Sequence, residues 1–363
     1  GSFTAMTASL TTRNYLAAIG TDGTLSTTWN PNVNNGVNAI AVSGTTVYAG
    51  GSFTLINQVA RNYLAAINPD GSLNTTWNPS ANGQVRAMAI SASTLYAGGD
   101  FTSVGCASGC SQIPSTAMNR LAAIGTNGTL NTTWNPNANN AVYAIAVSGS
   151  TVYVGGTFTT MSGGTATRNR LAAIGTDGTL SSWDPNANNT VNAIAVSGST
   201  VYVSGLFTTM TASLTTRNYL AAIGTDGTLS TTWNPNPNNA ALAIAVSGTK
   251  VYLGGSFTTM GGSARSYLAA VGTDGTLDAN WNPGVNSGTV ASMVVSGSTI
   301  YVGGSFTSIG GCAGGCSQMP LTTRNRLAAI GADGALLAWN PNVGSSPVNA
   351  IAISGSTVYA GGT

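Results

Sequence analysis

The chain has 363 residues, of which 42% are hydrophobic and only 6% are charged, whereas charged residues make up roughly a quarter of an ordinary soluble domain. A hydrophobic content this high excludes a disordered chain. The net charge is +2 and no basic cluster is present, which excludes the electrostatic footprint of a nucleic-acid-binding protein. The apolar runs are too short to cross a bilayer, so no membrane span is expected in this segment.

Aromatic residues recur in a unit of about 50 residues, which is the length of a propeller blade. All seven phenylalanines and seven of the twelve tyrosines keep the same interval as the seven tryptophans. An open β-solenoid is the main alternative, but its coils are usually shorter. The tryptophans are Trp29, Trp77, Trp134, Trp183, Trp233, Trp281 and Trp339.

One unit contains four predicted antiparallel strands and no helical period. Ser43-Gly44 begins a tight turn between the first two strands, and Asp70-Gly71 is predicted to close a type I′ hairpin before the fourth. The sequence therefore predicts an all-β fold. The strands are expected at residues 37–43, at 46–54, at 61–68, and in a segment that carries Leu73 and Trp77 and ends at Asn78-Pro79.

The two ends of the chain predict how the repeats join. Residues 1–4 read as the tail of a second strand, and residues 357–363 read as the head of one. The N-terminal third and fourth strands are thus expected to share a blade with the C-terminal first and second strands. This composite blade would close a ring of seven blades and leave no exposed sheet edge. We expect residues 1–363 to form a single propeller domain, taken from a longer chain.

An arginine recurs at the start of the third strand. A ring of guanidinium groups could bind an anion or a glycan, but a feature present in almost every blade is more typical of scaffolding, in which its N–H groups hold loop carbonyls between blades. The same reasoning assigns the tryptophans to packing between blades rather than to sugar stacking. The arginines are Arg13, Arg61, Arg168, Arg217, Arg265 and Arg324, with Met118 at the remaining position.

The inventory of reactive groups argues against an enzyme. The sequence has no His to activate a Ser or Thr, and the single lysine, Lys250, is expected to be solvated. Six aspartates precede Gly in the repeated hairpin, where they act as turn formers; Asp100, Asp184 and Asp278 remain, each in a different unit. We therefore expect no catalytic residues, no cofactor and no metal. Asp184 and nearby asparagines could supply oxygen ligands to Ca²⁺, but no DxDxDG-type spacing supports such a site.

The four cysteines form two CxxxC pairs in the two longest loops between second and third strands. Cys106 with Cys110 and Cys312 with Cys316 are predicted to form two local disulfides, which places the protein in an oxidising compartment. A zinc site would require both pairs to meet, although their blades lie near opposite sides of the ring. Reduced cysteines in a cytosolic chain are the alternative.

Sequence variation among the repeats indicates where a ligand would bind. The loops after the fourth strand, such as Asn30-Pro31-Asn32, and the long Cys loops are expected on one face of the ring, which we call the loop face; the opposite, turn face carries tight turns. The second residue of the innermost strand varies around the channel mouth. Drift at a tolerant position explains this variation equally well. The candidate binding residues there are Asn38, Arg86, Tyr143, Asn192 and Asn349, with Leu242 and Ala291 in the other two repeats.

The unit at residues 50–91 resembles the secreted bacterial "delta-sixty" propeller repeat and is distantly similar to the propellers of fungal cortical polarity markers. The resemblance rests on GGxFT, RNxLA, the Asp-Gly hairpin and the aromatic-Asn-Pro end of the fourth strand, and it covers all seven units. The chain departs from the family in using Ser-Gly where a longer DGK-type turn is common. The resemblance implies a large, surface-associated bacterial protein, and it carries no activity with it.

These observations favour a non-catalytic structural or adhesive propeller, extracellular or at the cell surface, such as a subunit of a surface filament or sheath. Its expected partner is a second copy of the chain or a surface molecule, since little charge opposes self-association. The alternative is a ligand- or glycan-binding propeller that uses the Asn-rich loop face.

Overall fold

The computed structural model describes residues 12–106, 113–211, 215–310, 319–344 and 346–363. Over these ranges the chain consists of strands and one short 3-10 helix, η1 (Ser162–Gly164), and no helix there is long or apolar enough to cross a membrane. The strands form seven three-stranded sheets and six two-stranded hairpins within the described ranges. The prediction of an all-β chain is therefore confirmed.

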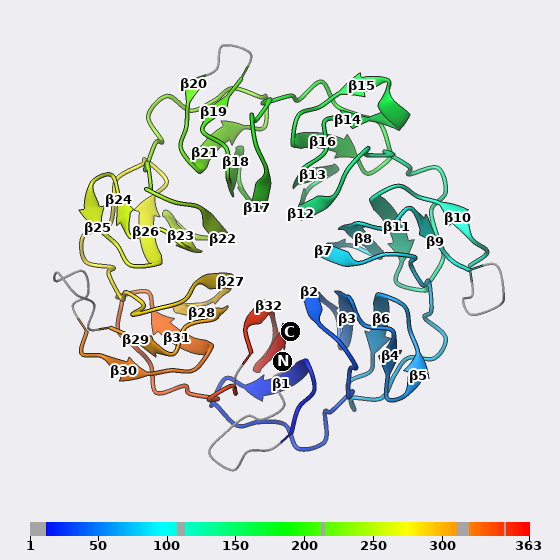
Figure 1. Cartoon of the computed structure of the whole chain (residues 1–363), viewed down its shortest axis with the longest axis horizontal. Helices are drawn as coiled ribbons and strands as arrows, with labels where there is room; N and C mark the ends of the chain where they lie inside the picture. The colour runs from blue at the N-terminus through cyan, green and yellow to red at the C-terminus, as the bar shows by residue number, and fades with distance from the viewer. Residues whose placement is uncertain (1–11, 107–112, 212–214, 311–318, 345) are drawn as a thin grey trace.

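The three-stranded sheets stand around a central opening, with one strand of each nearest the centre (Figure 1). Each of these inner strands contacts the next one along the chain, and the last contacts the first. The inner strands are β2 (Val37–Ser43), β7 (Val85–Ser91), β12 (Val142–Ser148), β17 (Val191–Ser197), β22 (Ala241–Ser247), β27 (Val290–Ser296) and β32 (Val348–Ser354).

Each inner strand pairs with a middle strand, which pairs with an outer strand. The middle strands are β3 (Thr46–Gly51), β8 (Thr94–Gly99), β13 (Thr151–Gly156), β18 (Thr200–Gly205), β23 (Lys250–Gly255), β28 (Thr299–Gly304) and β33 (Thr357–Gly362). The outer strands are β1 (Leu16–Gly20), β6 (Leu64–Ile67), β11 (Leu121–Gly125), β16 (Leu171–Gly175), β21 (Leu220–Gly224), β26 (Leu268–Gly272) and β31 (Leu327–Gly331).

The prediction of four strands per unit is wrong. After the hairpin, the segment that carries Leu73 makes only a single bridge, to Ile67 of the outer strand. The side chain of Asn74 then accepts hydrogen bonds from the backbone N–H groups of Thr76 and Trp77, and such an Asx turn competes with the sheet ladder. The chain therefore curls away from the sheet before it reaches Trp77.

A short hairpin that the sequence did not predict lies in the connection between middle and outer strands. The hairpin is formed by two strands of two residues each. In the first complete repeat the second strand, which was predicted at residues 46–54, therefore ends earlier, at Gly51. The hairpins are β4 (Leu55–Ile56) with β5 (Val59–Ala60), β9 (Ser103–Val104) with β10 (Thr116–Ala117), β14 (Thr160–Met161) with β15 (Ala166–Thr167), β19 (Thr209–Met210) with β20 (Thr215–Thr216), β24 (Thr259–Met260) with β25 (Ser263–Ala264), and β29 (Ser308–Ile309) with β30 (Thr322–Thr323).

The two ends of the described chain share one sheet. Outer strand β1 pairs antiparallel with β33, from Leu16 opposite Gly361 to Gly20 opposite Thr357, and β33 pairs with β32. This composite sheet was expected from the chain ends. Each three-stranded sheet is open, because its hydrogen-bond ladder does not continue into the next sheet.

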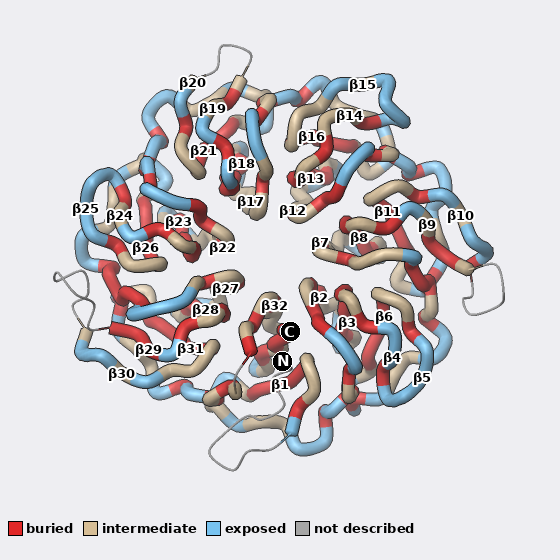
Figure 2. The backbone as a smooth tube through the Cα atoms, viewed as in Figure 1, coloured by how far each residue is buried: buried red, intermediate tan, exposed pale blue. Residues whose placement is uncertain are grey.

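The core lies between neighbouring sheets, where buried residues form a separate cluster at each junction (Figure 2). Each tryptophan is at most 5% exposed and packs against a tyrosine of its own sheet, and its Nε1 donates to a carbonyl of the next. Trp77, for example, meets Tyr48 edge-on at 5.0 Å between ring centroids and donates to Gly125 O at 3.1 Å. The predicted role of the tryptophans in packing is therefore confirmed.

The Asp-Gly hairpin was predicted as a type I′ turn, which requires positive φ at both residues, and this is wrong. Gly71 has a φ of 86°, but Asp70 is not among the residues with positive φ. The Asp70 carboxylate instead accepts from the Ser72 backbone N–H at 2.9 Å and from its hydroxyl at 2.6 Å. Aspartate is thus a turn former, as expected, but it acts through its side chain.

The turn between inner and middle strands places one alanine in a strained conformation. Ala92 has a φ of 50° at a position where the six equivalent turns use glycine, and it is exposed. Because the left-handed region costs an L-residue about 1–2 kcal/mol, we expect Ala92→Gly to raise the free energy of unfolding by about 1 kcal/mol in a urea titration. Gly149→Ala should lower it by a similar amount, and a loss of stability in Ala92→Gly would contradict this.

Candidate functional site

The second residue of every inner strand sits in a β-bulge. In the first complete repeat, Val37 lies opposite Gly51 and Ala39 opposite Gly50, so the pairing skips Asn38. The same shift occurs in the other six sheets, at the positions of Arg86, Tyr143, Asn192, Leu242, Ala291 and Asn349. A bulge re-aims a side chain that a regular strand would hold within the pleat.

All five predicted binding residues line one cavity of about 210 Å³ between the seven inner strands. The cavity is bounded by the bulge residues of the seven inner strands and by the apolar residues that follow them, such as Ala39 and Ile40. The structure thus brings together Asn38, Arg86, Tyr143, Asn192 and Asn349. Each of the seven inner strands supplies one bulge residue to the cavity lining, so a substitution of any bulge residue changes the cavity directly.

Arg86 is the centre of a charged cluster, and the equivalent inner-strand positions of the other repeats carry no charged residue. Its Nη2 lies 2.7 Å from Oδ2 of Asp100, and its Nε donates to the same oxygen at 2.9 Å. Its guanidinium carbon lies 5.2 Å from the ring centroid of Tyr143, in the next repeat, which is within cation–π range. Arg86 and Asp100 are each about one-third exposed (37% and 36%), so the pair faces solvent.

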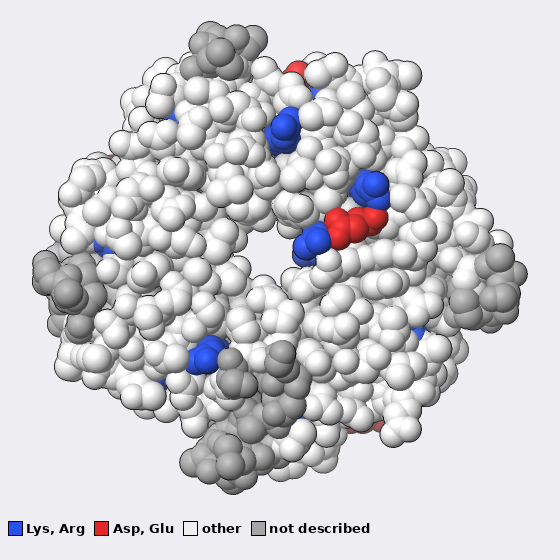
Figure 3. Space-filling view, in the orientation of Figure 1, with Lys and Arg blue, Asp and Glu red and all other residues white. Residues whose placement is uncertain are grey.

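Arg120 adds a second guanidinium to this cluster. Its Nη1 donates to the backbone carbonyls of Asp100 and Phe101. Figure 3 shows basic and acidic side chains adjoining at one edge of the central opening, whereas the other basic side chains visible on this face stand apart from one another. With two guanidinium groups and one carboxylate, the cluster carries net positive charge. We call Arg86, Asp100, Arg120 and Tyr143 the channel-mouth cluster.

The sequence did not identify Asp100 and Arg120 as members of this cluster, although Asp100 departs from the repeat. Asp100 follows the middle strand, where the equivalent residues include Ser52, Thr157 and Ser256. Arg120 stands at a position that holds either tyrosine or arginine, and its φ of 67° is left-handed, as it is at the equivalent position of every repeat. Three charged residues within one repeat could have been the signal, but their proximity depends on the pairing of β7, β8 and β11 in one sheet.

The other unmatched aspartates also lie beside cations. Lys250 Nζ is 2.7 Å from Asp278 Oδ2, and Arg168 Nη1 is 3.9 Å from Asp184 Oδ2. The hydrogen bond from Lys250 to Asp278 raises the pKa of the lysine, so the expectation that Lys250 is simply solvated is wrong. Among the described residues, no group of three or more acidic, His or Cys side chains could hold a metal ion.

The repeated arginines bind carbonyls, as the scaffold interpretation predicted. Arg265, for example, is buried, and it donates from Nη1 to Ala264 O at 2.8 Å and from Nη2 to Asp278 O at 3.0 Å. Its burial lowers its pKa. Both carbonyls lie within the same repeat, so the prediction that these arginines join neighbouring blades is wrong.

Asparagines on the loop face are largely engaged in the fold. The Asn34 side chain accepts from the backbone N–H groups of Thr54 and Leu55 at 2.9 Å, and its amide donates to the Thr54 hydroxyl. Asn82, Asn139, Asn188 and Asn238 make the same contacts in their own repeats. The asparagines that line the loops are therefore less free to bind a ligand than those at the bulges.

The disulfide prediction falls mainly outside the described residues, which exclude Cys110, Cys312 and Cys316. Cys106 lies just after β9, and its backbone N–H donates to Ile113 O at 3.1 Å, which joins the two ends of the Cys106 loop. The pairing of the cysteines stays a prediction.

Repeated antiparallel sheets around a central opening define a β-propeller protein. A family model described as a β-propeller domain of unknown function (DUF5122) matches residues 46–76 and 250–280. No curated protein matches the sequence. The β-propeller class is thus supported by both the fold and the family model, whereas the likeness to the "delta-sixty" family stays a prediction.

Solved structures share this fold at low sequence identity. The computationally designed Ika8 protein matches with a TM-score of 0.55 and 14% identity, over 90% of this chain and 96% of its own. The WD40 domain of Neurospora crassa Pan2 matches with a TM-score of 0.55 and 10% identity, over 90% and 89%. The extracellular domain of the putative one component system BT4673 from B. thetaiotaomicron matches with a TM-score of 0.53 and 15% identity, over 90% of this chain and 37% of that one. At these identities the likeness concerns the fold alone.

Proposed function

We propose that the chain is a non-catalytic structural or adhesive propeller of seven blades that acts outside the cell or at its surface. Closure of the ring is supported by the composite sheet, whose β32 contacts both β2 and β27. It is further supported by Trp339, which donates from Nε1 to Gly20 O at 2.8 Å across the junction of the chain ends. Nearly every repeated polar side chain makes its hydrogen bonds within the fold, and this observation carries the proposal of a structural role.

The low charge of the chain favours association between rings. With 6% charged residues, little electrostatic repulsion opposes the packing of one ring on another. The exposed large apolar residues in the described ranges are Leu55, Val59, Leu206 and Leu321. Their exposure does not by itself indicate that a second copy of the chain covers them. The proposal of self-association therefore rests on the weak electrostatic repulsion between rings and on the rigidity of the ring.

Sedimentation velocity and electron microscopy of the protein from its native source test the structural role. We expect the sedimentation coefficient to rise with concentration and ordered contacts between rings to appear in images. Isolated monomers at every concentration, with no ordered contacts, would refute this role.

Ligand binding at the channel mouth is the second candidate function, because seven bulges aim their side chains into one cavity and a charged cluster forms there. A glycan array, read with the native protein and with an Arg86→Gln/Tyr143→Leu variant, tests it. We expect the variant to lose binding while its stability changes by less than about 1 kcal/mol, since exposed ion pairs contribute little. An array without hits, or equal binding by both proteins, would refute this function.

A further inference from the structure

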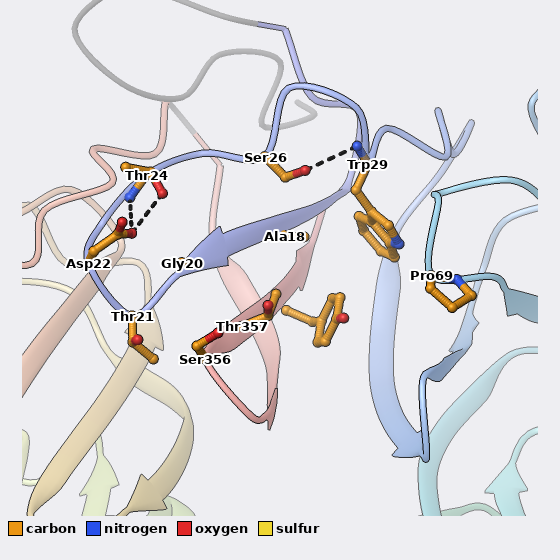
Figure 4. Close-up of a pocket in the computed structure, with 11 residues that line it drawn as sticks. Ala18, Gly20, Thr21, Asp22, Thr24, Ser26, Trp29, Pro69, Ser356 and Thr357 are labelled. Carbon is orange, nitrogen blue, oxygen red and sulfur yellow. Dashed lines mark hydrogen bonds between the residues drawn. The ribbon is translucent and has the colours of Figure 1, made fainter.

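A pocket of about 410 Å³ lies at the junction between the composite sheet and the sheet of β2, β3 and β6. It opens at the ends of β1 and β32, on the turn face, at the opposite end of the inner strand from the bulge of Asn349. In Figure 4, Thr21, Ser356 and Thr357 lie on one side and Trp29 and Pro69 on the other. Its volume is within the range of about 300–1,000 Å³ typical of small-molecule sites.

Tyr359 makes this pocket different from the equivalent positions of the other repeats. The six equivalent tyrosines are at most 4% exposed, whereas Tyr359 is only partly buried. Its ring meets Trp29 at 5.1 Å in a tilted arrangement, so the pocket has an accessible aromatic wall. The hydroxyl of Tyr48, by comparison, is directed to Thr126 O of the next sheet at 3.5 Å.

Pro69 alters one side of this groove, which also occurs, at about 360 Å³, beside the buried Tyr202, where Thr273 takes the place of Pro69. In other repeats, the residue at this position donates its backbone N–H to the turn between inner and middle strands, as Thr126 does to Ser93 O at 2.8 Å. Proline has no N–H, so Pro69 cannot donate the equivalent hydrogen bond to the turn between β2 and β3 of its own sheet.

The polar groups of the pocket are mostly hydroxyls, which both donate and accept hydrogen bonds. They come from Thr21, Ser26, Ser356, Thr357 and Tyr359. Asp22 lies at the rim, where hydrogen bonds from the Thr24 side chain and backbone hold its pKa below the usual range and keep it ionised. An anionic ligand would be repelled by this carboxylate. Hydroxyl groups beside an aromatic wall suit a polyhydroxylated ligand with one apolar face.

We propose that this pocket binds a neutral pyranose unit of a glycan. The chain itself shows how the same groove is closed elsewhere. In the sheet of β22, β23 and β26, Lys250 takes the place of Thr357 and Asp278 that of Ser26. The two side chains form an ion pair at 2.7 Å, and Lys250 Nζ also donates to Ala332 O, the position of Pro69, at 3.4 Å. That groove is filled by its own side chains.

The natural ion pair supplies a blocked variant. Ser26→Asp/Thr357→Lys transplants it into the pocket, and the fold tolerates the same pair at another junction, so the variant is expected to fold. Saturation-transfer NMR with glucose, galactose, mannose, N-acetylglucosamine and glucuronate should show transfer from at least one neutral sugar to the native protein. We expect affinity to fall at least tenfold in the blocked variant. Tyr359→Phe, a smaller change, should lower it about fivefold through the loss of one hydrogen bond.

The outcomes separate this site from the others. The absence of transfer from all five sugars, or equal transfer to the native and blocked proteins, overturns the proposal. Loss of transfer in the Arg86→Gln/Tyr143→Leu variant but not in the blocked variant assigns the sugar to the channel mouth and overturns it too. Glucuronate bound as tightly as the neutral sugars overturns the choice of a neutral ligand. Sedimentation of the blocked variant reports self-association separately, so either proposal can fail without the other.

Discussion

Trp339→Ala is expected to lower the free energy of unfolding by about 3–5 kcal/mol, which is the range for truncating a buried Trp. Trp339 is 5% exposed, meets Tyr301 edge-on at 5.1 Å and donates to Gly20 O at 2.8 Å. Its cluster contains Leu327 from one sheet and Val358 from the composite sheet. The substitution would therefore leave a cavity at the junction of the chain ends and remove one of the two hydrogen bonds that Gly20 O accepts, the other coming from the Gly23 N–H. Urea titration followed by circular dichroism measures the loss.

Trp134→Ala is the matched control, because Trp134 makes the same contacts between sheets that are continuous in sequence. It meets Tyr96 at 5.1 Å and donates to Gly175 O at 2.9 Å. In a closed ring the two substitutions should cost the same to within about 1 kcal/mol. A Trp339→Ala loss well below that of Trp134→Ala would show that the junction is open in solution and would contradict closure.

Gly304→Ala is expected to destabilise the fold by at least about 3 kcal/mol, because a Cβ atom at this position would lie 1.9 Å from Thr289 O. The neighbouring backbone cannot easily retreat. Thr289 O accepts from the Ser305 N–H at 3.0 Å, and the Gly304 N–H donates to Arg326 O at 3.0 Å. The same close approach occurs at the ends of β3, β8, β13, β18 and β23, as at Gly51, where Gly36 O would lie 2.1 Å from a Cβ.

Gly297→Ala is the control for this prediction. Gly297 has a φ of 56° in an exposed turn, and a Cβ there would meet nothing within 4 Å. Its replacement should cost about 1 kcal/mol through backbone strain alone. Both variants are compared in the same urea titration. Equal losses for Gly304→Ala and Gly297→Ala would contradict the steric account and assign the whole effect to backbone conformation.

Much of the fold could be predicted from the sequence, because its signals are local and repeated. The first strand, Val37–Ser43, is found with the expected bounds, since a short β-branched run before a glycine turn needs little context. The fourth strand was predicted wrongly because Asn74 bonds to its own backbone, a choice that an apolar Leu73 and Trp77 do not reveal. The type I′ turn failed for a similar reason, since the Asp70 side chain holds the turn.

The candidate sites were predicted only in part. Variation at one strand position pointed to Arg86 and Tyr143, and the structure places both at the same cavity. Asp100 and Arg120 lie beside Arg86 because β7, β8 and β11 pair in one sheet and a bulge re-aims Arg86, whereas Tyr143 comes from the next sheet. The pocket beside Tyr359 gave no sequence signal, since that tyrosine follows the same repeat as the buried ones.

By itself, the sequence of this protein determined its repeat, its β class, the inward packing of its aromatic residues and the sharing of one sheet by its ends. These properties follow from the spacing of apolar and turn residues along the chain. Only the tertiary structure decided the number of strands in each sheet, the channel-mouth cluster and the exposure of Tyr359. The physical reason is that such contacts join residues of different strands and sheets, whose distances depend on bulges, turns and packing that no single segment encodes.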